Sequence, residues 1–498
     1  MKKILLLSIS FFTICSLSAC NVVNNSNELV DAAPDPTSTT FVSPTITPTK
    51  TIEVTEYSKN SSFTLGEFPA SQLSIGDPYS PELGNLGYNV QEYHLQIEID
   101  PAFPDQFENT ALITAISDYP DLEYISFDFA GFTVHNVEVN DDDVEYLRTQ
   151  YKLLIKLNKP LKKNEEFFVY VHYSGKPDDS STPYSFIKFS QGAIFPTEDT
   201  MIVISEPDGS RKLFPCNDHP RDKAKFMVDV ITPNDLIGVS NGNLYNTQTL
   251  DSGEIMYSWQ SNDLMATYLL TVAIGNFSIE EYTFDNGLIV RNYVLPGTEN
   301  QLDTYMPILN EAMTYFEELF GPYPFETYGH VLHHMHGITL ESQATVALSS
   351  TMINENVLVH ELLHMWFGNW VSLDSWGEIW RNEGFATYFA KSWLNRDNPN
   401  SYINYLEAVY LDMLNRDDLY SLGALPQNEM FGYECYVIGS VLVYKLREEM
   451  GKEVFFTGLQ NYFNIYGGGT ASDAEFQVVM EDACQCSLEE FFNFWLEP

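Results

Sequence analysis

The chain has 498 residues, enough for two or more domains, and its 44% of hydrophobic residues supply large cores, which excludes a disordered protein. The formal net charge of −44 at pH 7 argues against nucleic acid or an anionic membrane surface as a partner, because both would repel it. The charge either serves solubility or belongs to an acidic cleft that attracts cationic substrates.

The first residues predict a secretory signal of the lipoprotein type. Lys2 and Lys3 precede an apolar run of signal length, which ends in the small residues "LSAC" at Leu17–Cys20. This ending resembles the bacterial lipobox, which implies that residues 1–19 are removed and that the Cys20 thiol carries lipid. The alternative is an ordinary signal peptide with a chance cysteine. No later stretch is apolar for long enough to span a bilayer.

Residues 20–75 are expected to form a disordered tether. The composition shifts to Asn, Ser, Thr and Pro, as in "PDPTSTTFVSPTITPTKT", and such a segment cannot bury enough surface to fold. The tether would hold the folded part away from the membrane at its outer, extracytoplasmic face.

Four cysteines remain in the folded part, namely Cys216, Cys435, Cys484 and Cys486. An outward-facing protein permits disulfides, but the spacing of these four residues determines no pairing. The spacing in "CQC" is too short for a comfortable bridge, so we expect none there.

Residues 76–285 predict a β-rich domain. In "YHLQIEID", Tyr93, Leu95, Ile97 and Ile99 fall on one face, and "FFVYVHY" alternates in the same way from Phe167. Turn residues separate the recurring strands, which is typical of a β domain.

Residues 286–498 predict a mainly helical domain. "YMPILNEAMTYFEELFG", from Tyr305, has the period of an amphipathic helix that ends at Gly321, and further helical stretches follow.

The stretch "VLVHELLHMWFGNW", Val357–Trp370, carries the first candidate site. On a helix His360 and His364 share a face, so both can reach one metal ion, and Glu361 would lie beside a water molecule on that ion. This HExxH pattern supplies two zinc ligands and a general base. The alternative is a buried core helix whose histidines find other polar partners.

A third ligand follows in "WGEIWRNEGFATYF". Glu383 follows His364 with eighteen residues between the two, in a second stretch of helical character. Catalytic zinc takes three protein ligands and keeps one open position, and an unpaired charge in this aromatic segment would be costly. We therefore predict a site for one Zn²⁺ ion formed by His360, His364 and Glu383.

These motifs resemble the zinc aminopeptidases of peptidase family M1, the gluzincins, which include aminopeptidase N and leukotriene hydrolase. Further stretches agree in order, namely "LFPCNDHPRDKAKF" at Leu213–Phe226, "SNG" at Ser240–Gly242, "FGPYPF" at Phe320–Phe325 and "FGNWV" at Phe367–Val371. The resemblance runs from about Gly87 to Leu496 and implies a multidomain α+β fold. An N-terminal β-sandwich or saddle-like domain would pack on a mainly helical, thermolysin-like catalytic domain, with the active site between them.

The resemblance also implies residue roles. Glu361 corresponds to the general base and Tyr436, in "YVIG", to the tyrosine that stabilises the oxyanion. Glu341, in "GITLES", and Glu206, eight residues before Phe214, correspond to the groups that bind the free α-amine of the substrate.

The sequence departs from the family pattern in three places. Leu340 and Ser342 replace the usual Met and Asn around Glu341, and the motif after Tyr436 lacks its lysine, which leaves Tyr433 as an alternative. The chain also stops at "FFNFWLEP", where the catalytic domain of the family ends. Without the later domains we expect a cleft that is more open to long peptides.

"HVLHHMH" offers a second group of histidines at His330, His333, His334 and His336. In a strand His334 and His336 would share a face with His330, so a second metal is conceivable, but no local carboxylate or cysteine completes the set. A solvent-exposed strand edge near the cleft is the favoured interpretation.

Together these patterns predict a lipid-anchored zinc aminopeptidase that trims peptides with a free N-terminus. The alternatives are a zinc endopeptidase with an open cleft and a non-catalytic peptide-binding surface lipoprotein. The presence of Glu361 argues against the last, because a binding module has no need of the base.

Overall fold

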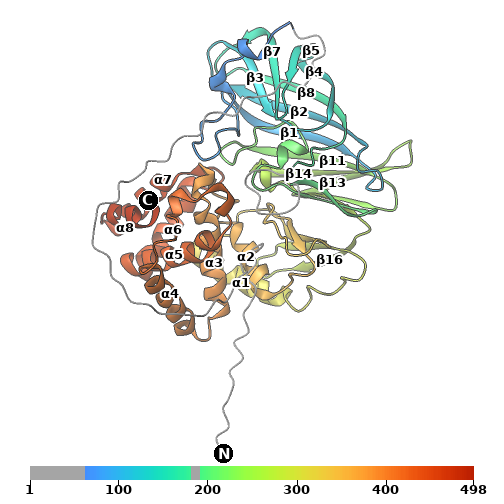
Figure 1. Ribbon diagram of the computed structural model, residues 1–498. Helices are drawn as coiled ribbons and strands as arrows, with labels where there is room; N and C mark the ends of the chain where they lie inside the picture. The colour runs from blue at the N-terminus through green and yellow to red at the C-terminus, as the bar shows by residue number, and fades with distance from the viewer. Residues whose placement is uncertain (1–61, 181–190, 498) are drawn as a thin grey trace, which may run out of the picture.

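The computed structural model describes residues 62–180 and 191–497, and it places strands in the first half of the chain and helices in the second (Figure 1). The predicted signal, Cys20 and most of the predicted tether lie outside the described residues. The α+β prediction, a β domain followed by a mainly helical domain, is confirmed. In the described part of the chain, none of the helices combines the length and the hydropathy that crossing a bilayer requires.

An eight-stranded sheet forms the body of the N-terminal domain. Its strands, in sheet order, are β13 (Asn243–Thr249), β14 (Ile255–Ala266), β11 (Lys223–Thr232), β1 (Tyr88–Glu98), β2 (Phe107–Ser117), β8 (Glu166–Gly175), β4 (Thr133–Val139) and β5 (Asp142–Asp143). β1 pairs with β11 in parallel and with β2 antiparallel. The predicted alternation is confirmed, since Tyr93, Leu95 and Ile97 of β1 are buried between more exposed neighbours.

A three-stranded sheet packs into the same core. It has the order β3 (Leu122–Asp128), β7 (Lys152–Leu161) and β6 (Glu145–Arg148). Ile125, Phe127 and Leu153 from this sheet join Phe167 and Val169 of β8 in one apolar cluster. Two sheets that share a core in this way give the domain its sandwich-like character.

A smaller four-stranded sheet, here the junction sheet, lies where the two domains meet. Its order is β12 (Ile237–Ser240), β15 (Val272–Gly275), β10 (Thr200–Ile204) and β9 (Gly192–Thr197). Val239 and Ile274 of this sheet belong to the same core cluster as Leu340, Ala347 and Trp376 of the helical half. The apolar core therefore continues across the domain junction.

The C-terminal half, predicted to be catalytic and here named the catalytic half, begins with its own sheet, with the order β16 (Ser278–Thr283), β17 (Ile289–Val294), β18 (Tyr328–His333) and β19 (Val346–Ser349). β17, β18 and β19 run parallel, whereas β16 and β17 form an antiparallel pair. The domain boundary predicted after residue 285 falls between β16 and β17, which pair along their length. The sheet thus groups β16 with the strands that follow it.

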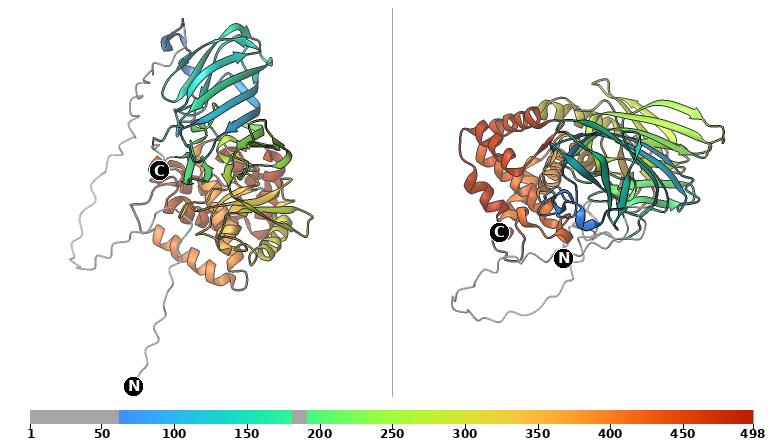
Figure 2. Two further views of the ribbon diagram at one scale, coloured as in Figure 1. Left: turned by 90° about the vertical axis from the view of Figure 1, so that its right-hand side faces the viewer. Right: turned by 90° about the horizontal axis from the view of Figure 1, so that it is seen from above.

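The helices form the other side of the catalytic half (Figures 1 and 2). They are α1 (Met306–Phe320), α2 (Glu355–His364), α3 (Trp380–Leu394), α4 (Pro399–Met413), α5 (Gly439–Met450), α6 (Lys452–Tyr466), α7 (Asp473–Cys484) and α8 (Glu489–Leu496). The helix predicted from Tyr305 is confirmed as α1, and Gly321 ends it with a φ of 103° that favours glycine. A short pair, β20 (Ser372–Leu373) and β21 (Thr470–Ala471), connects the segment before α3 to the segment before α7.

The end of the predicted tether is folded, which corrects the boundary at residue 75. Residues 62–75 contain two short 3₁₀ turns, η1 (Leu65–Glu67) and η2 (Ala70–Gln72). Phe63 and Phe68 are buried against Leu147 and Leu154 of the three-stranded sheet. The Ser/Thr/Pro composition had suggested disorder, but these apolar side chains bury enough surface to order the segment.

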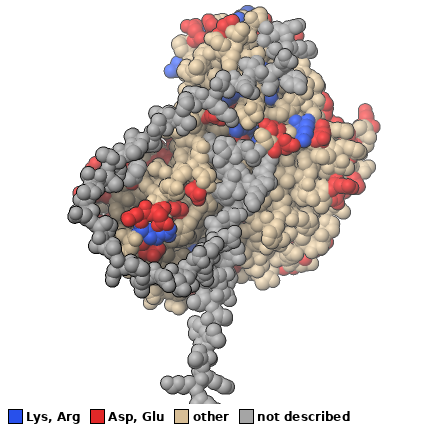
Figure 3. Space-filling model, viewed as in Figure 1, with Lys and Arg blue, Asp and Glu red and all other residues tan. Residues whose placement is uncertain are grey.

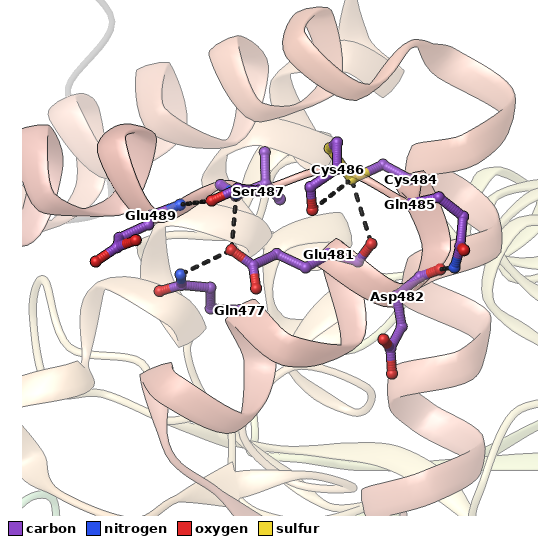
Figure 4. Close-up of a disulfide and its surroundings, with 9 residues drawn as sticks. Gln477, Glu481, Asp482, Cys484, Gln485, Cys486, Ser487 and Glu489 are labelled. Atoms are coloured by element: carbon purple, nitrogen blue, oxygen red, sulfur yellow. Dashed lines mark hydrogen bonds between the residues drawn. A yellow bond between two sulfur atoms is a disulfide. The ribbon is translucent and has the colours of Figure 1, made fainter.

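The expectation that "CQC" forms no bridge is wrong, because Cys484 and Cys486 form a disulfide (Figure 4). Between them Gln485 ends α7 in the left-handed region, with φ 53° and ψ 37°. This turn leaves the two Cα atoms 5.2 Å apart, within the usual range for a disulfide. Cys216 and Cys435 are free and buried.

Acidic side chains lie on the surface of both domains, as the face shown in Figure 3 illustrates. Acidic side chains outnumber basic ones in the chain as a whole, 69 to 25.

Candidate active site

The helix α2 presents His360, Glu361 and His364 from inside the catalytic half. The side chain of Asn354 caps it by accepting a hydrogen bond from the Val357 amide at 3.1 Å. Val357, Leu358 and Leu362 are buried in the second core cluster, so these apolar residues hold the helix in place. The helix is therefore both core and site, because its polar residues are buried as well.

Glu383 comes from the first turn of α3, which packs closely on α5. A Cβ atom on Gly384 would lie 2.8 Å from the backbone carbon of Gly439, so this approach requires glycine. The two glycines adjoin the site residues on both helices, since Gly384 follows Glu383 and Gly439 begins the helix three residues after Tyr436. The helix crossing therefore sets Glu383 beside the segment that carries Tyr436.

The three predicted ligands converge. His360 Nε2 lies 3.1 Å from His364 Nε2 and 3.1 Å from Glu383 Oε2, and His364 Nε2 lies 3.5 Å from Glu383 Oε2. Two atoms that each lie about 2.0–2.1 Å from one tetrahedral ion are about 3.3 Å apart. The three edges therefore fit the base of a tetrahedral zinc site, and the donor set of two imidazoles and one carboxylate suits zinc.

The ring of His364 is oriented by its second nitrogen. Its Nδ1 lies 3.2 Å from the carbonyl oxygen of Phe367, an acceptor, so Nδ1 carries the proton when the ring is in the neutral form that binds a metal. The Nε2 lone pair is then directed at the other two ligands. Such a partner for the second ring nitrogen is common among metal-binding histidines.

Several carboxylates surround these residues and favour a bound cation. Burial lowers the pKa of His364, but the carboxylates of Glu341 and Glu383 more than offset it and raise the pKa to about 10. Burial likewise raises the pKa of Glu383, yet His364 and His360 lower it to about 2. Burial also raises the pKa of Glu361 well above its usual range, with Glu341 and Glu383 adding to the effect. A site with these carboxylates favours a bound positive charge.

Tyr436 faces the first ligand. Its ring stacks with that of His360, with ring centres 6.1 Å apart and an angle of 25° between the planes. It lies in a π-helical turn, η8 (Glu434–Ile438), directly before α5. Single π-helical turns often occur at functional sites. Tyr433, the alternative, packs instead in the second core cluster near Arg416.

Glu206 and Glu341 join the same cluster from different parts of the chain. Glu206, Glu341 and Glu383 each place one carboxylate oxygen within 4.8 Å of the other two. Oε1 of Glu206 and Oε1 of Glu341 are both buried without a hydrogen-bond partner among the described residues. Burial and the neighbouring glutamates raise the pKa of both carboxyls. Two unsatisfied acceptors at this position fit a cationic donor such as an ammonium group.

The second group of histidines is dispersed, which corrects the interpretation as an exposed strand edge. His330 and His333 are buried in β18, which lies between β17 and β19, because the parallel sheet covers both of its edges. The strand ends at His333, so His334 and His336 do not continue its face. His330 Nδ1 lies 2.8 Å from the Asn292 side-chain oxygen, a structural contact, and burial lowers the pKa of His330 to about 3.

Sequence reasoning assigned no role to Asn241 or Asn369, although both lie in the stretches "SNG" and "FGNWV". In the structure the Nδ2 groups of both donate to backbone carbonyls of the segment that carries Glu341. The position of both residues inside stretches that resemble the family could have indicated a role.

Two helices that gather two histidines and a glutamate, with a second glutamate beside the first histidine, define the class of zinc metallopeptidases. The model of the peptidase family M1 domain matches residues 306–495, and that of the peptidase M1 N-terminal domain matches residues 89–269. The chain belongs to peptidase family M1.

Solved structures agree over nearly the whole fold. An M1 zinc metallopeptidase from Deinococcus radiodurans, in a structure with a bound Tyr-Ser-Ala substrate, has a TM-score of 0.78 and 26% identity, and the match covers 85% of this chain and 97% of that one. A structure described as a two-domain M1 zinc metallopeptidase bound to L-arginine has the same TM-score of 0.78 at 25% identity, covering 85% of this chain and 98% of that one.

Curated relatives are longer. Mitochondrial aminopeptidase 2 of Saccharomyces cerevisiae is 23% identical over 84% of this chain and 47% of its own length. Probable aminopeptidase 1 of Sulfurisphaera tokodaii is 25% identical over 82% of this chain and 53% of its own length. The chain thus spans about half the length of these relatives.

Proposed function

We propose that this protein is a zinc-dependent aminopeptidase that hydrolyses the first peptide bond of peptides with a free N-terminus. The observation that carries the proposal is the convergence of two groups of residues. His360, His364 and Glu383 form a ligand set with zinc-like edges, and Glu206 and Glu341 place carboxylate oxygens within 4.8 Å of Glu383. The family relatives named aminopeptidases support the same activity.

The three ligands would hold one Zn²⁺ ion, which when bound lowers the pKa of a water molecule and polarises the peptide carbonyl. Glu361 accepts the proton of the attacking water and passes it to the leaving amine. Burial on α2 raises the pKa of the Glu361 carboxyl, which makes it a stronger proton acceptor. The Tyr436 hydroxyl donates a hydrogen bond to the oxyanion of the transition state.

Glu206 and Glu341 give the reaction its direction. Their unsatisfied oxygens accept hydrogen bonds from the α-ammonium group of the substrate, and its positive charge offsets the repulsion between the two carboxylates. A peptide held by its N-terminus presents only its first peptide bond to Glu361 and Tyr436. An acetylated peptide lacks the charge and two of the donors, so it binds poorly.

The activity is tested with a panel of aminoacyl fluorogenic amides, with and without a chelator. We expect hydrolysis of several aminoacyl amides, its loss on chelation, and its recovery on addition of Zn²⁺ with one equivalent of bound metal. Hydrolysis that persists after the metal has been removed would exclude the proposal. Absence of hydrolysis in the zinc-loaded protein would favour the non-catalytic binding protein instead.

We further propose that the protein is anchored by lipid on Cys20 to the outer face of a bacterial membrane. The support is the lysine-led apolar run that ends in "LSAC", followed by a polar segment of tether composition. The full chain expressed in a bacterium should partition with membranes and carry acyl chains on Cys20. Cys20→Ala should abolish the acylation, and a membrane fraction unchanged by that substitution would contradict the anchor.

A further inference from the structure

The segment that carries Glu341 is held mainly by groups outside it. Leu340 and Ala347 exchange two backbone hydrogen bonds of 2.9 Å at its base, and Ala344 within it has a φ of 61°. A non-glycine residue in this region needs support from its surroundings. The position of the Glu341 carboxylate therefore depends on the groups that hold residues 341–345.

Three of these contacts come from residues next to strands of the junction sheet, since Asn241 follows β12 and Leu269 and Thr271 precede β15. Asn241 Nδ2 donates to the Gln343 carbonyl at 2.8 Å, and the Gln343 amide donates to the Leu269 carbonyl at 3.2 Å. Thr271 Oγ1 donates to the Thr345 carbonyl at 3.0 Å. The Glu341 segment is thus bonded on both sides of Ala344 to residues that precede the catalytic half in the chain.

Asn241 is itself fixed. Its Oδ1 accepts a hydrogen bond from the Thr271 amide at 2.7 Å, and its Nδ2 also donates to the Leu269 carbonyl at 3.1 Å. The side chain is buried, and it directly follows β12 of the junction sheet. A fully bonded buried amide of this kind has one orientation, so it transmits the position of the sheet to the Gln343 carbonyl.

Asn369 provides a second connection between the Glu341 segment and the N-terminal domain. Its Nδ2 donates to the Glu341 carbonyl at 2.7 Å, and its own carbonyl accepts a hydrogen bond from Lys223 Nζ at 2.8 Å. Lys223 belongs to β11 of the N-terminal domain and also donates to the carbonyls of Trp370 and Gly469, at 3.2 and 3.3 Å. The N-terminal domain therefore holds Glu341 by two separate routes.

The junction sheet also carries the other amine-binding carboxylate. β10 ends at Ile204, and Glu206 follows two residues later. The same small sheet therefore supports both glutamates. Glu206 is attached to it by the backbone after β10, and the segment of Glu341 is attached by hydrogen bonds from Asn241 and Thr271. A charge pair that binds one ammonium group must keep its spacing, because a misplacement of about 1 Å can cost on the order of 10² in rate.

We propose that Asn241 and Thr271 are positioning residues that determine exopeptidase selectivity, by holding Glu341 at the spacing from Glu206 that an α-ammonium group requires. The inference rests on the proposed aminopeptidase activity. Its specific consequence is that loosening the junction sheet weakens the preference for a free N-terminus while His360, His364, Glu383 and Glu361 stay in place.

The test compares Asn241→Ala with Asn109→Ala in the full chain. Asn109 is also buried, lies in β2 and accepts a hydrogen bond from the Glu98 amide at 3.2 Å, so it matches in residue type and burial but not in contact with the segment. For each variant we measure the zinc content, and KM and kcat on one peptide in its free form and in its acetylated form. The ratio of the two kcat/KM values gives the preference for a free N-terminus. Hydrogen exchange of residues 338–348 is followed as a readout that is independent of turnover.

For Asn241→Ala we expect unchanged zinc content, a KM for the free-amine substrate raised about tenfold, a smaller change in kcat, and faster exchange of residues 338–348. The preference for the free over the acetylated peptide should fall by about the same factor. Asn109→Ala should leave both the exchange of this segment and the preference at wild-type values.

Thr271 gives a second test with its own rescue, which decides the question if Asn241→Ala does not fold. Thr271→Val removes the hydroxyl at constant shape and should lower the preference, whereas Thr271→Ser retains the donor and should restore most of it. A preference unchanged in Asn241→Ala and Thr271→Val would overturn the inference. Wild-type protein that cleaves both peptides equally would instead refute the proposed aminopeptidase activity.

Discussion

The proposed zinc ligands and the two glutamates proposed to bind the substrate amine lie side by side but are built in opposite ways. His360, His364 and Glu383 come from two consecutive helices and lie within 24 residues of sequence, on backbone fixed by a cap and by the Gly384–Gly439 crossing. Glu206 and Glu341 come from positions far apart in the chain, and Glu341 depends on hydrogen bonds from the other domain. On the functions proposed above, the chemistry of this site depends on local structure, whereas its direction along the substrate depends on the domain junction.

The largest effect is expected when the general base Glu361 is removed and both the zinc ligands and the two amine-binding glutamates are kept. Glu361→Gln keeps the size and burial of the side chain but cannot accept the proton of the water, so kcat should fall on the order of 10⁴, with zinc retained and KM little changed. Metal analysis and steady-state kinetics on one aminoacyl amide measure this. Glu355→Gln, on the same helix α2 but outside the ligand cluster, is the matched control. Substantial turnover by Glu361→Gln would remove the base from the account.

A smaller loss is expected for the oxyanion donor. Tyr436→Phe keeps the ring that stacks on His360 and loses only the hydroxyl, so kcat should fall on the order of 10² while KM stays close to wild type. Tyr433→Phe, the alternative tyrosine, should have little effect because its ring packs in the core cluster. The reverse pattern would transfer the role to Tyr433.

The amine-binding pair should respond in KM and not in kcat. Glu341→Gln removes one negative charge beside the ammonium group, so KM for free-amine substrates should rise about tenfold to a hundredfold. Zinc content should be unchanged, since Glu341 is not among the three ligands. Glu326→Gln, an exposed glutamate of the same domain, serves as the control. A rise in KM of equal size for an acetylated substrate would show that Glu341 acts on the peptide in general and not on its amine.

The last expected effect is on stability, at the helix crossing. A Cβ on Gly384 would meet the backbone of Gly439 at 2.8 Å, so Gly384→Ala should push α3 and α5 apart and lower the free energy of unfolding by about 1–3 kcal/mol. Thermal unfolding followed by circular dichroism measures it. Gly66→Ala, where the nearest atom is a side-chain oxygen at 3.9 Å, should be close to neutral. An equal effect at both positions would mean that the close approach is not what requires glycine at residue 384.

The features that could be predicted from the sequence are those determined by residues close together in the chain. Period-two alternation identified β1, whose inward residues Tyr93, Leu95 and Ile97 are buried, and the spacing of His360, His364 and Glu383 identified a ligand set that the two helices bring together. Both patterns are visible because secondary structure converts sequence spacing directly into spatial spacing.

The remainder depends on contacts between remote segments or on single backbone angles. Asn241 and Thr271 bond to backbone carbonyls about 70 to 100 residues away, and any residue has such a carbonyl, so no residue type in the 341–345 segment reveals the partner. The order of residues 62–75 depends on a patch at Leu147 and Leu154, and the Cys484–Cys486 bridge depends on the left-handed turn at Gln485. The burial of His330 and His333 follows from the position of β18 inside its sheet, which sequence alternation alone does not specify.

We propose above all that the site acts from the N-terminus of a peptide. The most direct test of this proposal is mass spectrometry of the products that the zinc-loaded protein releases from one hexapeptide with a free N-terminus and from the same hexapeptide acetylated. We predict stepwise loss of single residues from the free peptide and no cleavage of the acetylated one on the same time scale. Internal fragments in similar yield from both peptides would contradict the account and identify an endopeptidase.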